Sequence, residues 1–125
     1  MSNEPALVLF AHGSRDAQWA EPFERIAALV RTAAPGVRLR VAYLERMAPD
    51  LDAAIAELAK EGARKVRLVP LFLGQGGHVR EDLPRLTGAV AARHGVEITV
   101  SAAAGEDPGV LEALARYCVA ELRRR

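Results

Sequence analysis

The chain has 125 residues, of which 50% are hydrophobic and 26% are charged, and its formal net charge is +1. This length is typical of one domain with a single core, and the balanced charge excludes the basic footprint of a nucleic-acid-binding protein. The lone cysteine excludes an intrachain disulfide and suits a reducing compartment. Residues 1–5 lack a signal-peptide pattern, and no apolar run approaches the roughly 20 residues of a membrane span. We expect a cytoplasmic protein without nucleic-acid or membrane partners.

Four short apolar runs alternate along the chain with four longer segments of helical period. The runs cover residues 6–11, 37–44, 64–71 and 97–102. Such alternation is typical of βαβ units with helices on both faces of a parallel sheet. Because crossover connections are right-handed, we expect a single-domain α/β fold with an open, doubly wound, parallel four-stranded sheet. The strand order 2-1-3-4 is our hypothesis for this sheet.

The segments between these runs carry apolar residues at spacings of three and four, which predicts amphipathic helices. The predicted apolar faces are Trp19, Phe23, Ile26 and Val30; Leu51, Ile55 and Leu58; Val79, Leu83, Leu86 and Val90; and Val110, Leu111, Leu114, Cys118 and Leu122. Asp107 and Pro108 are predicted to begin the last helix as its N-cap and first residue. Since Cys118 lies on the apolar face of that helix, we expect it to be buried.

Two of the three histidines follow the runs that become the first and third strands. His12 follows the run 6–11, and His78 follows the third run after a glycine-rich turn. In open α/β sheets, ligands bind at the carboxyl ends of the strands where the strand order reverses, which here lies between strands 1 and 3. Two imidazoles in one crevice could hold a divalent metal or transfer protons. His94, beside a glycine at a helix end, is interpreted as a cation that complements the helix dipole.

Other candidate residues are expected at the same edge of the sheet. Glu45 follows the second run, and it could complete a His/His/Glu set or take up a proton. Ser14 and Arg15 could bind an anion at a helix N-terminus, or Ser14 could simply cap that helix. The turn Gly74, Gln75, Gly76 and Gly77 has little side-chain bulk, which leaves room for a flat ligand. It lacks the glycine spacing of a nucleotide-binding loop.

Three motifs occur in the same order as in a known family. They are His12-Gly13-Ser14-Arg15, Tyr43-Leu44-Glu45 with Pro49, and Gly77-His78-Val79 with Asp82-Leu83-Pro84. With these motifs the chain resembles the class II tetrapyrrole chelatases, in particular the short sirohydrochlorin cobaltochelatases of the CbiX type. The resemblance implies one chelatase-like α/β domain over residues 1–125. It also implies insertion of Co²⁺, or Fe²⁺ or Ni²⁺, into sirohydrochlorin without ATP, in cobalamin or siroheme biosynthesis.

The resemblance also implies roles for individual residues. His12 and His78 would bind the incoming ion and accept protons from the pyrrole nitrogens, with Glu45 as a third participant. Arg15, Arg46 and the Gly74–Gly77 backbone would bind the carboxylates of the substrate. No tightly bound cofactor is expected, because the metal is itself a substrate. Since long relatives have two fused lobes and this chain has one, a symmetric homodimer is expected.

Two other functions are compatible with the histidines. A non-catalytic metal or tetrapyrrole carrier could keep the same residues without turnover. A strand that runs into His12-Gly13 also superficially resembles phosphohistidine phosphatases. Those enzymes have an arginine immediately before the histidine, whereas Ala11 precedes His12 here, so we consider the phosphatase function the weaker hypothesis.

Overall fold

The sheet has four parallel strands in the order β2-β1-β3-β4 in the computed structural model, which describes residues 4–125 apart from the side chain of His78. The strands are β1 (Ala6–Ala11), β2 (Leu39–Tyr43), β3 (Lys65–Pro70) and β4 (Glu97–Val100). The predicted fold class and strand order are confirmed. Three strands are shorter than the apolar runs 37–44, 64–71 and 97–102 that predicted them.

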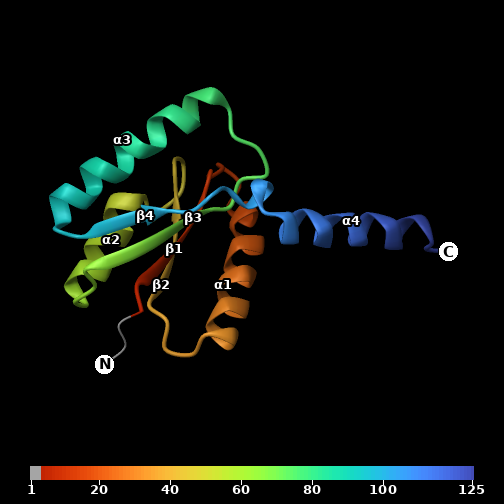
Figure 1. Ribbon diagram of the computed structural model, residues 1–125, viewed down its shortest axis with the longest axis horizontal. Helices are drawn as coiled ribbons and strands as arrows, with labels where there is room; N and C mark the ends of the chain where they lie inside the picture. Colours follow the sequence, from red (N-terminus) through yellow and green to blue (C-terminus); the bar gives the residue numbers. More distant parts are fainter. Residues whose placement is uncertain (1–3) are drawn as a thin grey trace.

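Helices cover both faces of the sheet. Helix α1 (Glu21–Ala33) lies on one face, and α2 (Leu51–Lys60) and α3 (Gly77–His94) lie on the other, as Figure 1 shows. The Asp50 carboxylate accepts a hydrogen bond from the Ala53 amide at 2.9 Å, which caps the start of α2. Helices α1, α2 and α3 each begin near the carboxyl edge of the sheet and run back along it (Figure 1).

The main core lies between the sheet and the pair α2 and α3. Phe10, Ile55, Leu58 and Leu68 are fully buried there. This packing confirms the apolar face predicted for the second helix. A smaller cluster under α1 joins Leu9, Ala27 and Leu39.

The first helix differs from the prediction. Trp19 lies in a separate 3₁₀ turn, η1 (Ala17–Ala20), and Pro22 stands at the start of α1. Trp19 is half-buried and stacks near Phe23, with ring centroids 4.7 Å apart. Ile26 is 37% exposed, whereas Ala27 is buried against the sheet. The change from 3₁₀ to α geometry rotates the helix, so that the predicted four-residue stripe does not face the core as a unit.

Helix α4 (Pro108–Leu122) leaves the carboxyl edge and points away from the sheet on the side of α1, as Figure 1 shows. Its start is as predicted, because the Asp107 carboxylate accepts from the Val110 amide at 3.1 Å. The prediction that Cys118 is buried is wrong: Cys118 is exposed. Among the described elements, only the 3₁₀ turn η2 (Ala104–Glu106) packs substantially against α4. None of the described helices is long and apolar enough to cross a membrane.

Candidate functional site

His12 and Glu45 lie side by side where β1 and β2 end. The His12 Nε2 atom is 3.3 Å from Glu45 Oε1, and each side chain is 49% exposed. Backbone pairing continues past the strands, because the Glu45 amide donates to the His12 carbonyl at 3.1 Å. The predicted proximity of these two residues is thus confirmed, and an imidazole beside a carboxylate is a group that can accept and pass on a proton.

Gly13 sets the close approach of the two strand ends. Its φ is +102°, a conformation that favours glycine. A Cβ at this position would lie 1.8 Å from the Glu45 carbonyl oxygen. No side chain fits in that space without movement of the backbone. Position 13 must therefore be glycine for the Glu45 backbone to lie where it does.

Arg46 completes the turn beyond Glu45. Its φ is +66°, and the Met47 amide donates to the Glu45 carbonyl at 2.9 Å across this turn. A non-glycine residue in this region is strained, and such strain is common at functional sites. The Arg46 Nε atom is 3.9 Å from the Glu45 Oε1 atom. The Glu45 carboxylate is therefore in contact with an imidazole and a guanidinium.

Phe72 supports the His12 ring from the loop after β3. The ring centroids of the two residues are 6.2 Å apart at an interplanar angle of 71°, an edge-on arrangement. Phe72 is buried and also contacts Phe10. Sequence reasoning did not assign Phe72 to the site, although its position directly after the third strand was a usable signal.

The glycines in the turn after β3 are not packed against other parts of the chain. A Cβ at Gly74, Gly76 or Gly77 would meet nothing within 4 Å. Gly76 is the N-cap of α3, and His78 lies in the first turn of that helix, at the carboxyl edge that also holds His12. The prediction that the His78 side chain binds metal concerns a side chain outside the described part of the structure. The open space beside the turn agrees with room for a ligand.

Ser14 does not cap the first helix. Its hydroxyl accepts a hydrogen bond from the Asp16 amide at 3.1 Å, and the Asp16 carboxylate caps η1 by accepting from the Gln18 amide at 3.0 Å. The capping alternative for Ser14 is therefore wrong, because the helical residues begin only at Ala17. Arg15 is exposed beside it. Ser14 and Arg15 follow His12 by two and three positions in the sequence.

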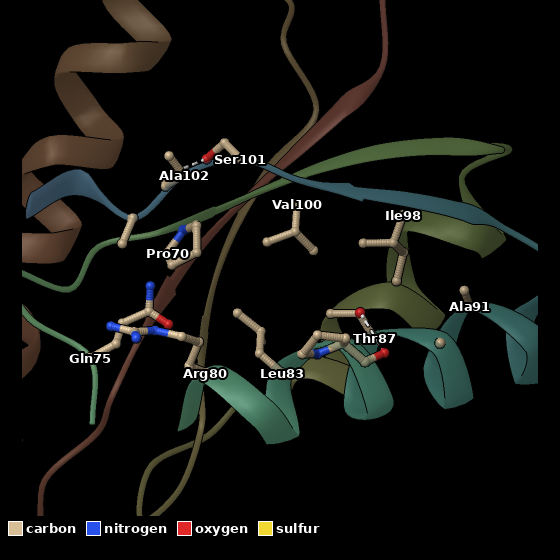
Figure 2. Close-up of a pocket in the computed structure, with 13 residues that line it drawn as sticks. Pro70, Gln75, Arg80, Leu83, Thr87, Ala91, Ile98, Val100, Ser101 and Ala102 are labelled. Atoms are coloured by element: carbon tan, nitrogen blue, oxygen red, sulfur yellow. Dashed lines mark hydrogen bonds between the residues drawn. The ribbon is translucent and has the colours of Figure 1, made fainter. Parts of the chain in front are cut away.

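A pocket near this edge does not include His12. A cavity of about 480 Å³ lies between α3 and β4. Figure 2 shows Ile98 and Val100 of β4 facing Leu83 of α3 across it, with Gln75 and Arg80 at one end. Among the described side chains, no group of three or more His, Cys, Asp or Glu residues could hold a metal ion. The described part of the site is thus an open edge with one histidine and one carboxylate.

His94 has a different environment near the end of α3. Its Nε2 atom is 2.9 Å from the Asp52 Oδ1 atom of α2, and Arg93 pairs with the same oxygen. The hydrogen bond from His94, reinforced by Arg93, lowers the pKa of the Asp52 carboxyl from its ordinary value of 3.8. This second histidine–carboxylate pair joins α2 to α3.

The parallel four-stranded sheet and the His12–Glu45 pair at its carboxyl edge define a single-domain α/β protein with a candidate site at that edge. The sequence profile of the CbiX family matches residues 6–120, so the chain belongs to the CbiX family. A CbiX protein from Marinobacter aquaeolei VT8, known from a crystal structure, is 33% identical to this chain with a TM-score of 0.89. The match covers 98% of this chain and 100% of that one.

Curated relatives carry a consistent name. The sirohydrochlorin cobaltochelatase of Methanopyrus kandleri is 32% identical over 66% of this chain, and that of Methanocaldococcus jannaschii is 32% identical over 71%. The matched segments span 58% and 62% of those relatives' lengths. The fold also recurs in the sirohydrochlorin chelatase SirB of Bacillus subtilis subspecies spizizenii in complex with cobalt. That match has 22% identity and a TM-score of 0.76, and covers 90% of this chain but 49% of SirB.

Proposed function

We propose that this chain is a chelatase that inserts Co²⁺ into sirohydrochlorin without ATP, with Fe²⁺ or Ni²⁺ as other candidate metals. The observation that carries the proposal is the His12–Glu45 pair at the carboxyl edge of the sheet, in a chain of the CbiX family. Relatives named sirohydrochlorin cobaltochelatase support both the tetrapyrrole and the metal. Solved SirB structures with Fe³⁺ and with cobalt have the same fold.

The proposed mechanism uses His12 as ligand and base. Two pyrrole N–H protons must leave the ring as the cation enters it. The lone pair of a neutral imidazole can bind the incoming ion, and it can accept a proton once the ion has moved into the ring. Glu45, 3.3 Å from His12 Nε2, would accept a hydrogen bond from the resulting imidazolium and stabilise its charge. His78 is proposed as the second ligand and base.

The open geometry suits delivery of the metal better than storage. Half-exposed side chains leave most coordination positions of an ion available to water or to the ring nitrogens. A closed cage would instead hold the ion against transfer. Two imidazole donors suit several divalent metals, so we expect metal choice to depend on availability as well as on the site.

Substrate binding is proposed to involve the cations and amides around this edge. Arg15 and Arg46 are exposed next to His12 and Glu45, and guanidinium groups bind carboxylates strongly. Backbone amides of the Gly74–Gly77 turn, with Ser14 and Gln75, are proposed as further donors. The space beside the glycines would accept one face of the macrocycle.

We also propose that residues 1–125 act as one domain in a cytoplasmic homodimer. The chain matches 45% and 49% of two SirB chains, but the whole of the Marinobacter CbiX chain. A second copy would therefore stand where SirB has further sequence. Two-fold symmetry would then bring the His12 and Glu45 residues of both copies to one cavity.

Anaerobic absorbance spectroscopy tests this function. Sirohydrochlorin and CoCl₂ are mixed with a small amount of protein, and the ring spectrum is followed. A chelatase converts many rings per chain, whereas a carrier changes at most one ring per binding site. His78→Ala should slow the reaction strongly. A stoichiometric change in the wild type would replace the chelatase proposal with the carrier, and an unchanged rate in His78→Ala would remove His78 from the site.

A further inference from the structure

The cavity of about 480 Å³ between α3 and β4 has no part in the function proposed above. On β4 its wall is formed by Ile98 and Val100, which alternate along the strand and so lie on one face of the sheet. The wall on α3 is a single face of the helix, because its residues recur at spacings of three and four. These residues are Arg80, Leu83, Pro84, Thr87, Gly88 and Ala91. Two regular elements therefore form the walls of the cavity.

The cavity is apolar along its length and polar at one end. Figure 2 shows Leu83 facing Val100 across the cavity, and the polar ends of Gln75 and Arg80 lying together at its end near the carboxyl edge. The Thr87 hydroxyl donates to the Pro84 carbonyl at 3.2 Å, so its proton is already used. Among the described residues that line the cavity, Arg80 alone is charged, and no described carboxylate pairs with it. Apolar walls with a few grouped polar side chains are typical of small-molecule sites.

The space is long and narrow. Arg80 and Ala91 line its two ends, and at a rise of 1.5 Å per residue they lie about 16 Å apart along α3. A volume of about 480 Å³ over that length gives a mean cross-section of about 30 Å². One extended chain fills such a space, and the tetrapyrrole ring does not enter it. Gly88 keeps the middle open, since a Cβ there would meet nothing within 4 Å.

The cavity is also separate from the proposed metal site. His12 does not line it. Positions 78 and 80 are two residues apart on α3, which places them about 200° apart around the helix axis. Residues two apart on a helix do not face each other. A tetrapyrrole held at position 78 would have to pass around the start of α3 to reach Arg80.

We propose that this cavity is a binding site for a small carboxylic acid with an unbranched apolar tail, as in a medium-chain fatty acid. The tail would lie between Leu83 and Val100, with apolar burial as the driving force. The carboxylate would accept hydrogen bonds from the Arg80 guanidinium and the Gln75 side-chain amide. One guanidinium balances the single charge of a carboxylate, whereas a phosphate ester carries up to two charges. The proposal does not depend on metal insertion.

An NMR titration with octanoate is the first test. The amide signals of Gln75, Thr87, Gly88 and Val100 should shift and saturate together in the isotope-labelled protein. 1-Octanol has the same tail without the charge, and it should bind at least about tenfold more weakly, because hydrogen bonds to charged groups are the stronger ones. Acetate, which has no tail, should not shift these signals. Shifts that do not saturate, shifts confined to other residues, or equal binding of 1-octanol would overturn the proposal.

Substitutions on α3 test the tail and the carboxylate separately. Gly88→Leu should abolish octanoate binding, because its side chain would occupy the open space at this position. Arg80→Gln should weaken octanoate at least about tenfold and leave 1-octanol unchanged. Ala92→Leu and Arg85→Gln are the matched controls, since both positions are exposed on α3 and neither lines the cavity. Wild-type affinity in Arg80→Gln or in folded Gly88→Leu, or equal weakening in the controls, would overturn the proposal.

Two further ligands test which compound the cavity takes. Octyl phosphate carries the same tail on a different anion, and it should bind no more tightly than octanoate. Metal-free sirohydrochlorin should leave the affinity for octanoate unchanged. Octyl phosphate that binds tenfold more tightly would replace the carboxylic acid with a phosphate ester and overturn the proposal. Displacement of octanoate by sirohydrochlorin would assign the cavity to the tetrapyrrole and overturn it as well.

Discussion

Two histidine–carboxylate pairs in this chain have the same chemistry and different surroundings. His12 and Glu45 are 3.3 Å apart at the carboxyl edge, and both are 49% exposed. His94 and Asp52 are 2.9 Å apart in a contact between α2 and α3, where the His94 side chain is only 19% exposed and Arg93 binds the same carboxylate. The Asp52 carboxylate of the second pair is thus shared by two protein partners, His94 and Arg93. The first pair is half exposed to solvent, and we propose that it accepts an ion and a proton.

The comparison also shows what each pair requires from the backbone. Gly13 and the strained Arg46 hold the exposed pair in place, whereas the His94 pair joins two regular helices. Of the two pairs, the exposed one has a strained non-glycine residue beside it, Arg46. Such strain is common at functional sites. The variants below test this difference in order of decreasing effect.

Gly13→Ala should have the largest effect. A Cβ would lie 1.8 Å from the Glu45 carbonyl oxygen at a φ of +102°, so we expect a loss of at least about 2 kcal/mol in the free energy of unfolding. Chelatase activity should be lost with it. Gly74→Ala is the control, because its Cβ meets open space, and its stability should change by no more than about 1 kcal/mol. Equal destabilisation in urea titrations of the two variants would contradict the close packing at Gly13.

Glu45→Gln should reduce cobalt insertion by about tenfold, which is typical when the partner of a metal-binding histidine is removed. The neutral amide no longer stabilises a protonated His12. Stability should hardly change, because an exposed ion pair contributes at most about 1 kcal/mol. The rate is measured with Glu57→Gln as the control, since Glu57 forms its ion pair with Arg40 instead. Equal rates in both variants would remove Glu45 from the mechanism.

Asp52→Asn should have the smallest effect, on stability alone. The folded-state pKa of Asp52 lies below its ordinary value of 3.8, chiefly because His94 and then Arg93 bind the carboxylate. This contribution to stability is therefore present above the ordinary value and is lost as the pH falls through the lower folded-state pKa. The urea midpoint of Asp52→Asn should be slightly lower than that of the wild type at pH 7, with the difference disappearing below pH 3.8. A difference that is independent of pH would argue against the ion pair.

The sequence predicted the strand order and the edge at which the site lies. Right-handed crossovers leave few topologies for four strands. His12 directly follows β1 and Glu45 follows β2 after one intervening residue, so their proximity depended only on which strands are neighbours. The family motifs then supplied the chemistry. These features are local or topological, and they can be predicted without knowledge of the packing.

The sequence could not predict contacts that depend on packing between distant segments. Periodicity identified the apolar face of α4 but could not show that this face is exposed, which is why Cys118 was wrongly placed in the core. The rotation between η1 and α1 left Ile26 partly exposed for the same reason. The edge-on contact of Phe72 with His12, and the contact of Gly13 with Glu45, join residues more than 30 positions apart.

The central claim is that the exposed histidine does the chemistry and the enclosed one does not. The most direct measurement is the initial rate of cobalt insertion into sirohydrochlorin by His12→Ala and His94→Ala, compared with the wild type. We predict that His12→Ala is at least about 100-fold slower, because a base and metal ligand is lost, and that His94→Ala keeps the wild-type rate at temperatures where it is folded. Equal rates in the two variants, or a larger loss in His94→Ala, would contradict the account.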